Sequence, residues 1–155
     1  MTNGGVNVKR LLLKPLAKLP CNKVPVFCYG TLQIPTLQRI LFGQRVRGCS
    51  AKLYGWQRLM SHDGYWFITP KPGAVVRGKV IWLSVQQLQH CDNWEEVPYY
   101  QRERVRVLQG NRHLSTYAYT RRGAKGKAKS TSSLSAFPLP TVFKAAKQSR
   151  FAASP

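Results

Sequence analysis

The pattern of apolar and polar positions predicts a compact unit of short strands and helices between residues 24 and 120. Residues 24–32 are an apolar run of strand-forming residues that stops at a Tyr-Gly-Thr-Leu turn, which predicts a strand followed by a tight loop. Apolar residues at helical spacing, with Pro35 in the first turn, predict a short helix over residues 33–42. Residues 46–60 alternate loosely and contain two glycines, as expected for bent strands of a curled sheet.

Two further strands are predicted in the middle of the chain. Residues 65–69 form a short strand pattern, and we expect Pro70, Pro72 and Gly73 to end it. Residues 75–83 alternate most clearly and predict a separate strand.

The next predicted elements are a helix and a hairpin. Ser84 and Gln87 have the spacing of a capping box, and the helix that they open is expected to turn Val85, Leu88 and Cys91 inward. Two alternating stretches, 100–108 and 113–119, are joined by a turn sequence that contains Gly110 and predicts a hairpin. Arg102, Arg104 and Arg106 share one face of its first strand, and that face is expected to meet either solvent or RNA.

Charge changes this picture at both ends of the chain. The 155 residues contain 25 Lys and Arg against 5 Asp and Glu, a formal charge of +20. Residues 1–23 and 121–155 contain no acidic residue, so the chain is predicted to be one domain over residues 24–120 with a basic arm at each end. So much uncompensated charge favours a polyanionic partner, and nucleic acid is the obvious one.

The two arms have different compositions. Residues 1–23 resemble an organellar transit peptide in composition, although an RNA-binding arm would look the same, and the Met at position 1 favours a retained arm. Residues 121–155 are rich in Gly, Ala, Lys and Ser and cannot bury enough apolar surface to fold alone, so RNA is expected to order them. The candidate nucleic-acid-binding residues are Lys9, Arg10, Lys14, Lys18, Arg121, Arg122, Lys125, Lys127, Lys129, Lys144, Lys147 and Arg150.

The cysteines and histidines predict neither a metal site nor a cofactor. Cys21, Cys28, Cys49 and Cys91 have no zinc-ligand or haem-attachment spacing, and the three histidines are scattered. Cys28 lies in an apolar run and is expected to be buried as a free thiol, which indicates a reducing compartment. No apolar run is long enough to span a bilayer.

Two segments about sixty residues apart carry a family resemblance. The first is the turn Tyr29-Gly30-Thr31-Leu32, and the second runs from Leu88 through Asp92 and Glu95 to Tyr100 and Arg102. Together they resemble the γ-glutamylcyclotransferase-like family, most closely its compact γ-glutamylamine cyclotransferase branch. The resemblance covers residues 24–120 and implies an α+β fold, a small mixed β-barrel with short helices, without the basic arms.

The resemblance also implies a reaction and a set of site residues. In that family the substrate's α-amine attacks its own γ-amide carbonyl, which releases 5-oxoproline and an amine. It implies Glu95 as the general acid and base, the backbone of Tyr29, Gly30, Thr31 and Leu32 as the binder of the substrate's carboxylate or oxyanion, and Tyr100 in the pocket wall. Glu96 stands where the family commonly has glycine, but Glu95 itself is intact, so the sequence permits activity.

Two functions are weighed. We favour an RNA-associated component of a ribonucleoprotein, such as a mitochondrial ribosome or its assembly intermediate, because a small-molecule enzyme has no use for acid-free arms. Its partners would be rRNA and neighbouring proteins, and its location an organelle matrix. The alternative is an active γ-glutamyl or γ-glutamylamine cyclotransferase, in an organelle or the cytoplasm, and fold alone does not decide between them. A basic enzyme that binds DNA or an acidic membrane without specificity ranks below both.

Overall fold

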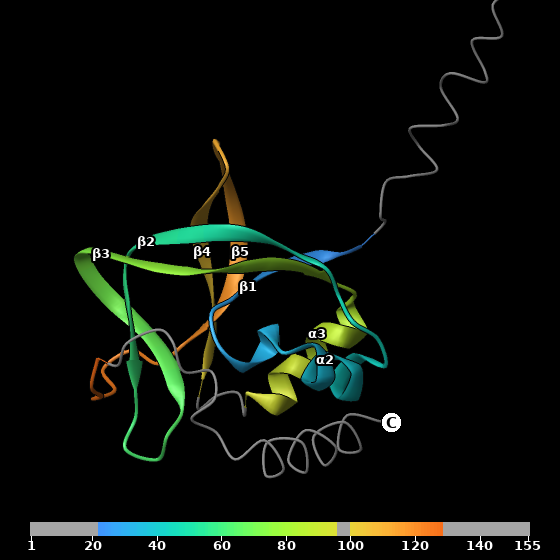
Figure 1. Cartoon of the computed structure of the whole chain (residues 1–155), viewed down its shortest axis with the longest axis horizontal. Coiled ribbons are helices and arrows are strands. Elements are labelled where there is room, and N and C mark those ends of the chain that lie inside the picture. Colours follow the sequence, from blue (N-terminus) through green and yellow to red (C-terminus); the bar gives the residue numbers. More distant parts are fainter. Residues whose placement is uncertain (1–21, 96–99, 129–155) are drawn as a thin grey trace, which may run out of the picture.

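The computed structural model describes residues 22–95 and 100–128, and these form one small barrel with short helices (Figure 1). The elements are, in order, β1 (Val24–Cys28), the 3-10 turn η1 (Thr31–Gln33), α2 (Pro35–Phe42), β2 (Gly48–Met60), β3 (Trp66–Leu83), α3 (Val85–Trp94), β4 (Gln101–Gln109) and β5 (Arg112–Thr120).

The strands close into a barrel in the order β1-β3-β2-β4-β5. All strand pairs are antiparallel except β1 with β5, which meet in parallel where Val26 faces Tyr117 and so close the barrel. Helices α2 and α3 lie together on one side of it (Figure 1). The predicted fold, an α+β mixed barrel with short helices, is confirmed.

Local sequence signals explain both helices. Helix α2 starts with Pro35 and stops at Gly43, whose φ of 75° is the left-handed conformation that ends helices. Helix α3 opens with the predicted capping box: Gln87 N–H donates to Ser84 Oγ at 3.1 Å, and Ser84 N–H donates to Gln87 Oε1 at 2.9 Å. Leu88 and Cys91 are buried as predicted, but the prediction for Val85 is wrong. Val85 is the first residue of the helix and is 56% exposed, outside the cluster that buries the other two.

The prediction of two separate strands at 65–69 and 75–83 is wrong, because β3 runs through Pro70, Pro72 and Gly73. Strand β1 pairs with β3 only at residues 79–83. Pro70 and Pro72 therefore have no neighbouring strand on that edge to which a backbone N–H would have to donate. The prolines instead lie at or beside a large bulge, where residues 71–74 of β3 stand opposite Gly55 of β2. Gly55 and Gly73 both have a φ of 80°, so the turn residues bend the strand pair without ending it.

Two hydrophobic clusters hold the domain together. One packs α2 and α3 against the sheet and includes Leu37, Leu41, Cys91 and Ile81. The other lies among the strands and includes Phe27 and Ile68. Val26 and Cys28 of β1 belong to the first cluster and Phe27 to the second, as the alternation of side chains along a strand requires.

The hairpin of β4 and β5 is confirmed, with Gln109 paired to Arg112 across a turn in which Gly110 has a φ of 58°. Arg102, Arg104 and Arg106 are exposed on its first strand. The guanidinium groups of Arg102 and Arg104 lie 5.2 and 5.0 Å from the ring centre of Tyr117, so this face of the hairpin is positively charged.

Residues 121–128 pack on the barrel after β5 ends. Met60 and Lys127 exchange two backbone hydrogen bonds of 3.0 Å, and Arg121 N–H donates to the carbonyl of Ile68 at 3.3 Å. Gly126 fits only because it has no side chain: a Cβ there would lie 2.6 Å from the carbonyl oxygen of Met60. Residues 121–128 therefore pack on the domain beyond residue 120. The domain boundary at residue 120 stays a prediction.

Several predictions fall outside the described residues: the N-terminal arm up to residue 21, and Lys129, Lys144, Lys147 and Arg150 of the tail. Cys28 and Cys91 are buried free thiols, and Cys49 is an exposed one. In the part of the chain that the structure describes, no helix is long and apolar enough to cross a membrane.

Candidate active site

The Tyr-Gly-Thr-Leu turn follows directly on β1. Its carbonyls close the helical turn: Gln33 N–H donates to Gly30 O at 3.1 Å and Ile34 N–H to Thr31 O at 2.9 Å. The first N–H groups of such a turn have no partner inside it and face outward from its start. Gly30 has a φ of −136°, so a positive φ is not the reason for glycine here.

Tyr29 and Arg58 fix the position of this turn. The buried Tyr29 hydroxyl donates to the carbonyl of Tyr119 on β5 at 2.6 Å, and the Tyr29 carbonyl accepts from Arg58 Nη1 at 2.7 Å. The Arg58 guanidinium also stacks on the ring of Trp66 at 4.5 Å, and its burial lowers its pKa from the ordinary value. Arg58 and Trp66 were not predicted as site residues, because an arginine among the alternating residues of β2 looks like any solvated arginine and a tryptophan in a strand looks like a core residue.

Glu95 lies at the C-terminal end of α3, where its N–H donates to the Cys91 carbonyl at 2.8 Å. Burial raises the pKa of its carboxyl group to about 8. Its charge in turn helps to raise the pKa values of Tyr29 and Tyr100, after the larger effect of their own burial. The Glu95 carboxyl group is therefore near enough to Tyr29 and Tyr100, which lie far away in the sequence, to act on both electrostatically.

Tyr100 forms another wall of the site. It is buried, and its hydroxyl donates to the backbone carbonyl of Trp66 at 3.0 Å. The Arg121 guanidinium lies 5.4 Å from the Tyr100 ring centre, and its hydrogen bond to the Tyr100 side chain acts against the rise in pKa that burial causes. Arg121, predicted as an RNA-binding residue of the tail, is thus packed beside the candidate site.

Asp92 anchors the helix that presents Glu95. One carboxylate oxygen accepts from Arg102 Nη1 at 2.6 Å and the other from the Tyr119 hydroxyl at 2.7 Å. These bonds join the last turn of α3 to β4 and β5 and fix where Glu95 can point. Arg102, which was expected to face solvent or RNA, supports the site through Asp92.

Buried cysteines and possible metal-ligand clusters are the other catalytic candidates among the described residues. Burial raises the pKa of the Cys28 and Cys91 thiols well above the ordinary value, so neither is a thiolate nucleophile at neutral pH. Among residues 22–95 and 100–128, no cluster of His, Cys, Asp and Glu could hold a metal ion. What the site offers is a carboxyl group that can exchange protons near neutral pH, beside a turn of backbone donors.

The remaining candidate RNA-binding residues in the described segment are Arg122, Lys125 and Lys127. Arg122 pairs with Glu103 at 2.8 Å, and its guanidinium lies 5.2 Å from the Trp56 ring centre. The side chains of Lys125 and Lys127 are exposed.

Comparison with known proteins agrees with this geometry. The family model described as "Gamma-glutamyl cyclotransferase, AIG2-like" matches residues 26–135, which contain the Tyr29 turn, Glu95 and Tyr100. A search of curated proteins returns no match. The family match supports the cyclotransferase alternative better than the ribonucleoprotein interpretation.

Solved structures share the fold. A protein from Arabidopsis thaliana is 24% identical with a TM-score of 0.59, over 66% of this chain and 70% of its own. A structure named gamma-glutamyl cyclotransferase is 17% identical with a TM-score of 0.60, over 68% of this chain and 70% of its own. An uncharacterized protein from Homo sapiens is 18% identical with a TM-score of 0.59, over 80% of this chain and 86% of its own. With the family match over most of its length, this chain belongs to the AIG2-like gamma-glutamyl cyclotransferase family.

Proposed function

We propose that the chain is a γ-glutamyl or γ-glutamylamine cyclotransferase in which Glu95 is the general acid and base. The observation that carries the proposal is the pKa of the Glu95 carboxyl group, which burial raises to about 8, next to Tyr29 and Tyr100. A group with a pKa near the working pH can both accept and return a proton within one turnover. A solvated glutamate, with its pKa near 4.5, would be a poor proton donor.

The proposed reaction is a ring closure within the substrate. The α-amine nitrogen forms a bond to the γ-carbonyl carbon, and Glu95 takes a proton from that amine. The bond between the carbonyl carbon and the departing nitrogen then breaks, and Glu95 gives its proton to the leaving amine. Because both reacting groups belong to one molecule, the protein contributes orientation and proton transfer rather than a covalent intermediate.

The other residues have supporting roles. The backbone N–H groups at Gly30, Thr31 and Leu32 bind the α-carboxylate or the oxyanion of the tetrahedral intermediate. Arg58 holds this turn through the Tyr29 carbonyl, and Tyr100 forms the wall against which the substrate chain lies. Glu96, which stands where the family commonly has glycine, lies outside the described residues.

The test is direct detection of 5-oxoproline. The purified full chain is incubated with a panel of γ-glutamyl amino acids and γ-glutamylamines, and 5-oxoproline is measured by mass spectrometry. We expect Glu95→Gln to lower the rate by a factor of about 10² to 10⁴, the usual share of general acid and base catalysis. Glu103→Gln, the same change on β4, is the matched control; it loses the ion pair with Arg122 and should lower the rate far less. Absence of product from every substrate, with the wild-type protein folded, would refute the proposal.

As a second candidate, we propose that the protein also associates with RNA. Apart from Glu95, the carboxylates of the described residues are engaged locally: Asp92 with Arg102, Glu103 with Arg122, and Asp63 with the hydroxyl of Ser61. They leave most of the arginines and lysines of the surface without an acidic partner, as expected of a protein that binds a polyanion. Sedimentation of the native protein on a density gradient tests this, since ribonuclease should slow it if it is part of a ribonucleoprotein. Equal, slow sedimentation with and without ribonuclease would contradict this second candidate.

A further inference from the structure

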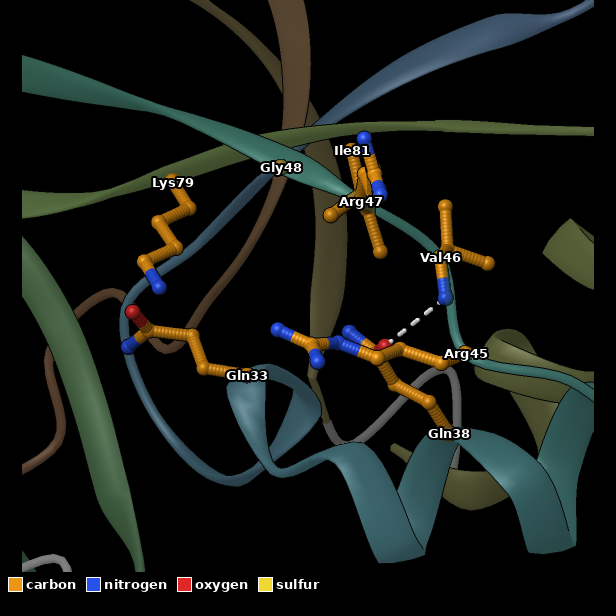
Figure 2. A pocket seen from close by; sticks show the side chains of 8 residues that line it. All are labelled: Gln33, Gln38, Arg45, Val46, Arg47, Gly48, Lys79 and Ile81. Carbon is orange, nitrogen blue, oxygen red and sulfur yellow. Dashed lines mark hydrogen bonds between the residues drawn. The ribbon is translucent and has the colours of Figure 1, made fainter.

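A cavity whose lining includes neither Glu95, Tyr29 nor Tyr100 lies between the start of α2 and the strands β2 and β3, and it borders the Tyr29 turn through Gln33 and Gln38 (Figure 2). It has a volume of about 340 Å³, which is within the range of about 300–1,000 Å³ that small-molecule sites occupy. Gln33 and Gln38 line one side, and Arg45, Arg47 and Lys79 supply its charge. We call it the Arg45 pocket. It shares no lining residue with the cluster around Glu95.

The charge of the Arg45 pocket has one sign. Three of its lining residues are cationic and none is a carboxylate. Within the described residues, neither arginine nor Lys79 forms an ion pair, since the two salt bridges there join other residues. Figure 2 shows Lys79 extending across the pocket toward the amide of Gln33, with the Arg45 guanidinium between Gln33 and Gln38. All three cationic residues are exposed, so water screens their mutual repulsion, and the excess of positive charge makes the pocket attractive to an anion.

The floor of the pocket is held in place before any ligand binds. Gln38 is 3% exposed, and its side chain joins two segments: Nε2 donates to the Leu32 carbonyl at 2.8 Å, and Oε1 accepts from Val46 N–H at 2.9 Å (Figure 2). The loop that carries Arg45 and Arg47 is thereby fixed to the turn that carries Gln33. A fixed loop reduces the ordering cost that ligand binding would otherwise carry.

Gly48 keeps the strand wall of the pocket open. A Cβ at this position would lie 3.0 Å from Ile81 Cγ2 and 3.1 Å from Lys79 Cβ, closer than ordinary contacts. Any side chain there would displace the two residues of β3 that line the pocket. Gly48 therefore lets β2 and β3 approach closely and leaves the cavity unobstructed.

We propose that the Arg45 pocket binds a phosphate group, carried either by a small phosphorylated molecule or by the backbone of a nucleic acid. A guanidinium presents a planar fork that pairs with two oxygens of a phosphate, and Lys79 adds a compact charge for a third. The Gln33 amide, whose Nε2 donates to the Gly30 carbonyl at 3.4 Å, has a second N–H that can serve as a neutral donor next to them. This inference does not depend on cyclotransferase activity.

The experiment measures the binding of pyrophosphate and of a single-stranded RNA oligonucleotide to the full chain by calorimetry. The pocket variant is Arg45→Gln with Lys79→Gln. The matched control, Lys71→Gln with Arg77→Gln, removes the same charge from exposed positions of β3 that do not line the pocket. We expect the pocket variant to lose at least tenfold in pyrophosphate affinity and the control variant to lose less than twofold. Circular dichroism and melting curves establish that both variants are folded.

The two ligands distinguish the sources of the phosphate. If the pocket variant loses RNA affinity more than the control does, the phosphate belongs to a nucleic acid. If only pyrophosphate binding is lost, the ligand is a small phosphorylated molecule. Equal losses in the two variants, no binding by the wild type, or binding of the dicarboxylate glutarate as tight as that of pyrophosphate would overturn the proposal.

Discussion

At the scale of single residues, Glu95 makes stability depend on pH in a predictable direction. Its pKa is about 8 in the folded protein and near the ordinary 4.5 when unfolded, so between these values the folded state holds a proton that the unfolded state has lost. The unfolding free energy should therefore fall as pH rises from about 4.5 to about 8 and then level off. Glu95→Gln removes this dependence. Compared with the wild type, the unfolding free energy of the variant should therefore gain on the order of a few kcal/mol between low pH and pH above 8.

Denaturant titrations at pH 4.5, 6.5 and 8.5 measure this effect as the difference between variant and wild type. The difference should grow with pH for Glu95→Gln, because burial raises the pKa of the Glu95 carboxyl group. Parallel curves for wild type and Glu95→Gln would mean that the carboxyl group titrates normally.

The same pKa predicts that kcat/KM rises with pH through about 8, since ring closure begins with the ionised carboxylate.

Replacing Arg58 should disturb the position of the Tyr29 turn without changing the group that transfers the proton, Glu95. Arg58→Met keeps an apolar stem on Trp66 but removes the donor to the Tyr29 carbonyl, which should cost about 1–3 kcal/mol of stability. We expect KM to rise more than kcat falls, because the turn binds substrate while Glu95 performs the chemistry. Arg77→Gln, an exposed change on β3, is the control. A fall in kcat with unchanged KM would place Arg58 in the chemical step instead.

At the scale of elements, residues 121–128 act as a strap that closes over the barrel next to Tyr100. Gly126→Ala would place a Cβ 2.6 Å from the Met60 carbonyl and 2.7 Å from the Phe67 ring, so the strap must shift. We expect a loss of about 1–3 kcal/mol in unfolding free energy. Because Arg121 hydrogen-bonds Tyr100 from the same strap, 5-oxoproline formation should fall as well. Lys125→Ala, at an exposed neighbouring position, should change neither, and an equally stable Gly126→Ala would show that the strap is not held at this point.

The sequence predicted the elements that depend on local signals. It did not predict features that depend on contacts between residues far apart in the chain. Pro35 and the Ser84 box fixed both helix starts, and alternation fixed the hairpin. The continuity of β3 through Pro70 and Pro72 could not be inferred, because it depends on β1 ending before it reaches them. Glu95, Tyr29 and Tyr100 were predicted through a family resemblance, whereas Arg58 and Trp66 have no local signal and become site residues only through the register of β2 and β3.

At the scale of the whole molecule, excess positive charge could act through the tail or through the barrel surface. A truncation that tests the tail must end after residue 128, because residues 121–128 pack on the barrel and Arg121 contacts Tyr100. Deleting 129–155 removes Lys129, Lys144, Lys147 and Arg150. If these neutralise phosphates, the slope of log affinity against log salt should shrink by up to about 3, at about 0.7 per phosphate on a single strand.

The matched comparison is Arg104→Gln with Arg106→Gln, which removes charge from the exposed face of β4 and leaves the tail intact. Binding of a single-stranded RNA is measured at several salt concentrations for the full chain, the truncation and this double variant. A smaller slope in the truncation alone assigns RNA contact to the tail, because each lost phosphate contact releases one fewer set of counterions. A smaller slope in the double variant alone assigns it to the β4–β5 face. An unchanged slope in both would contradict a role in RNA binding for either, and the charge would then need another polyanion to explain it.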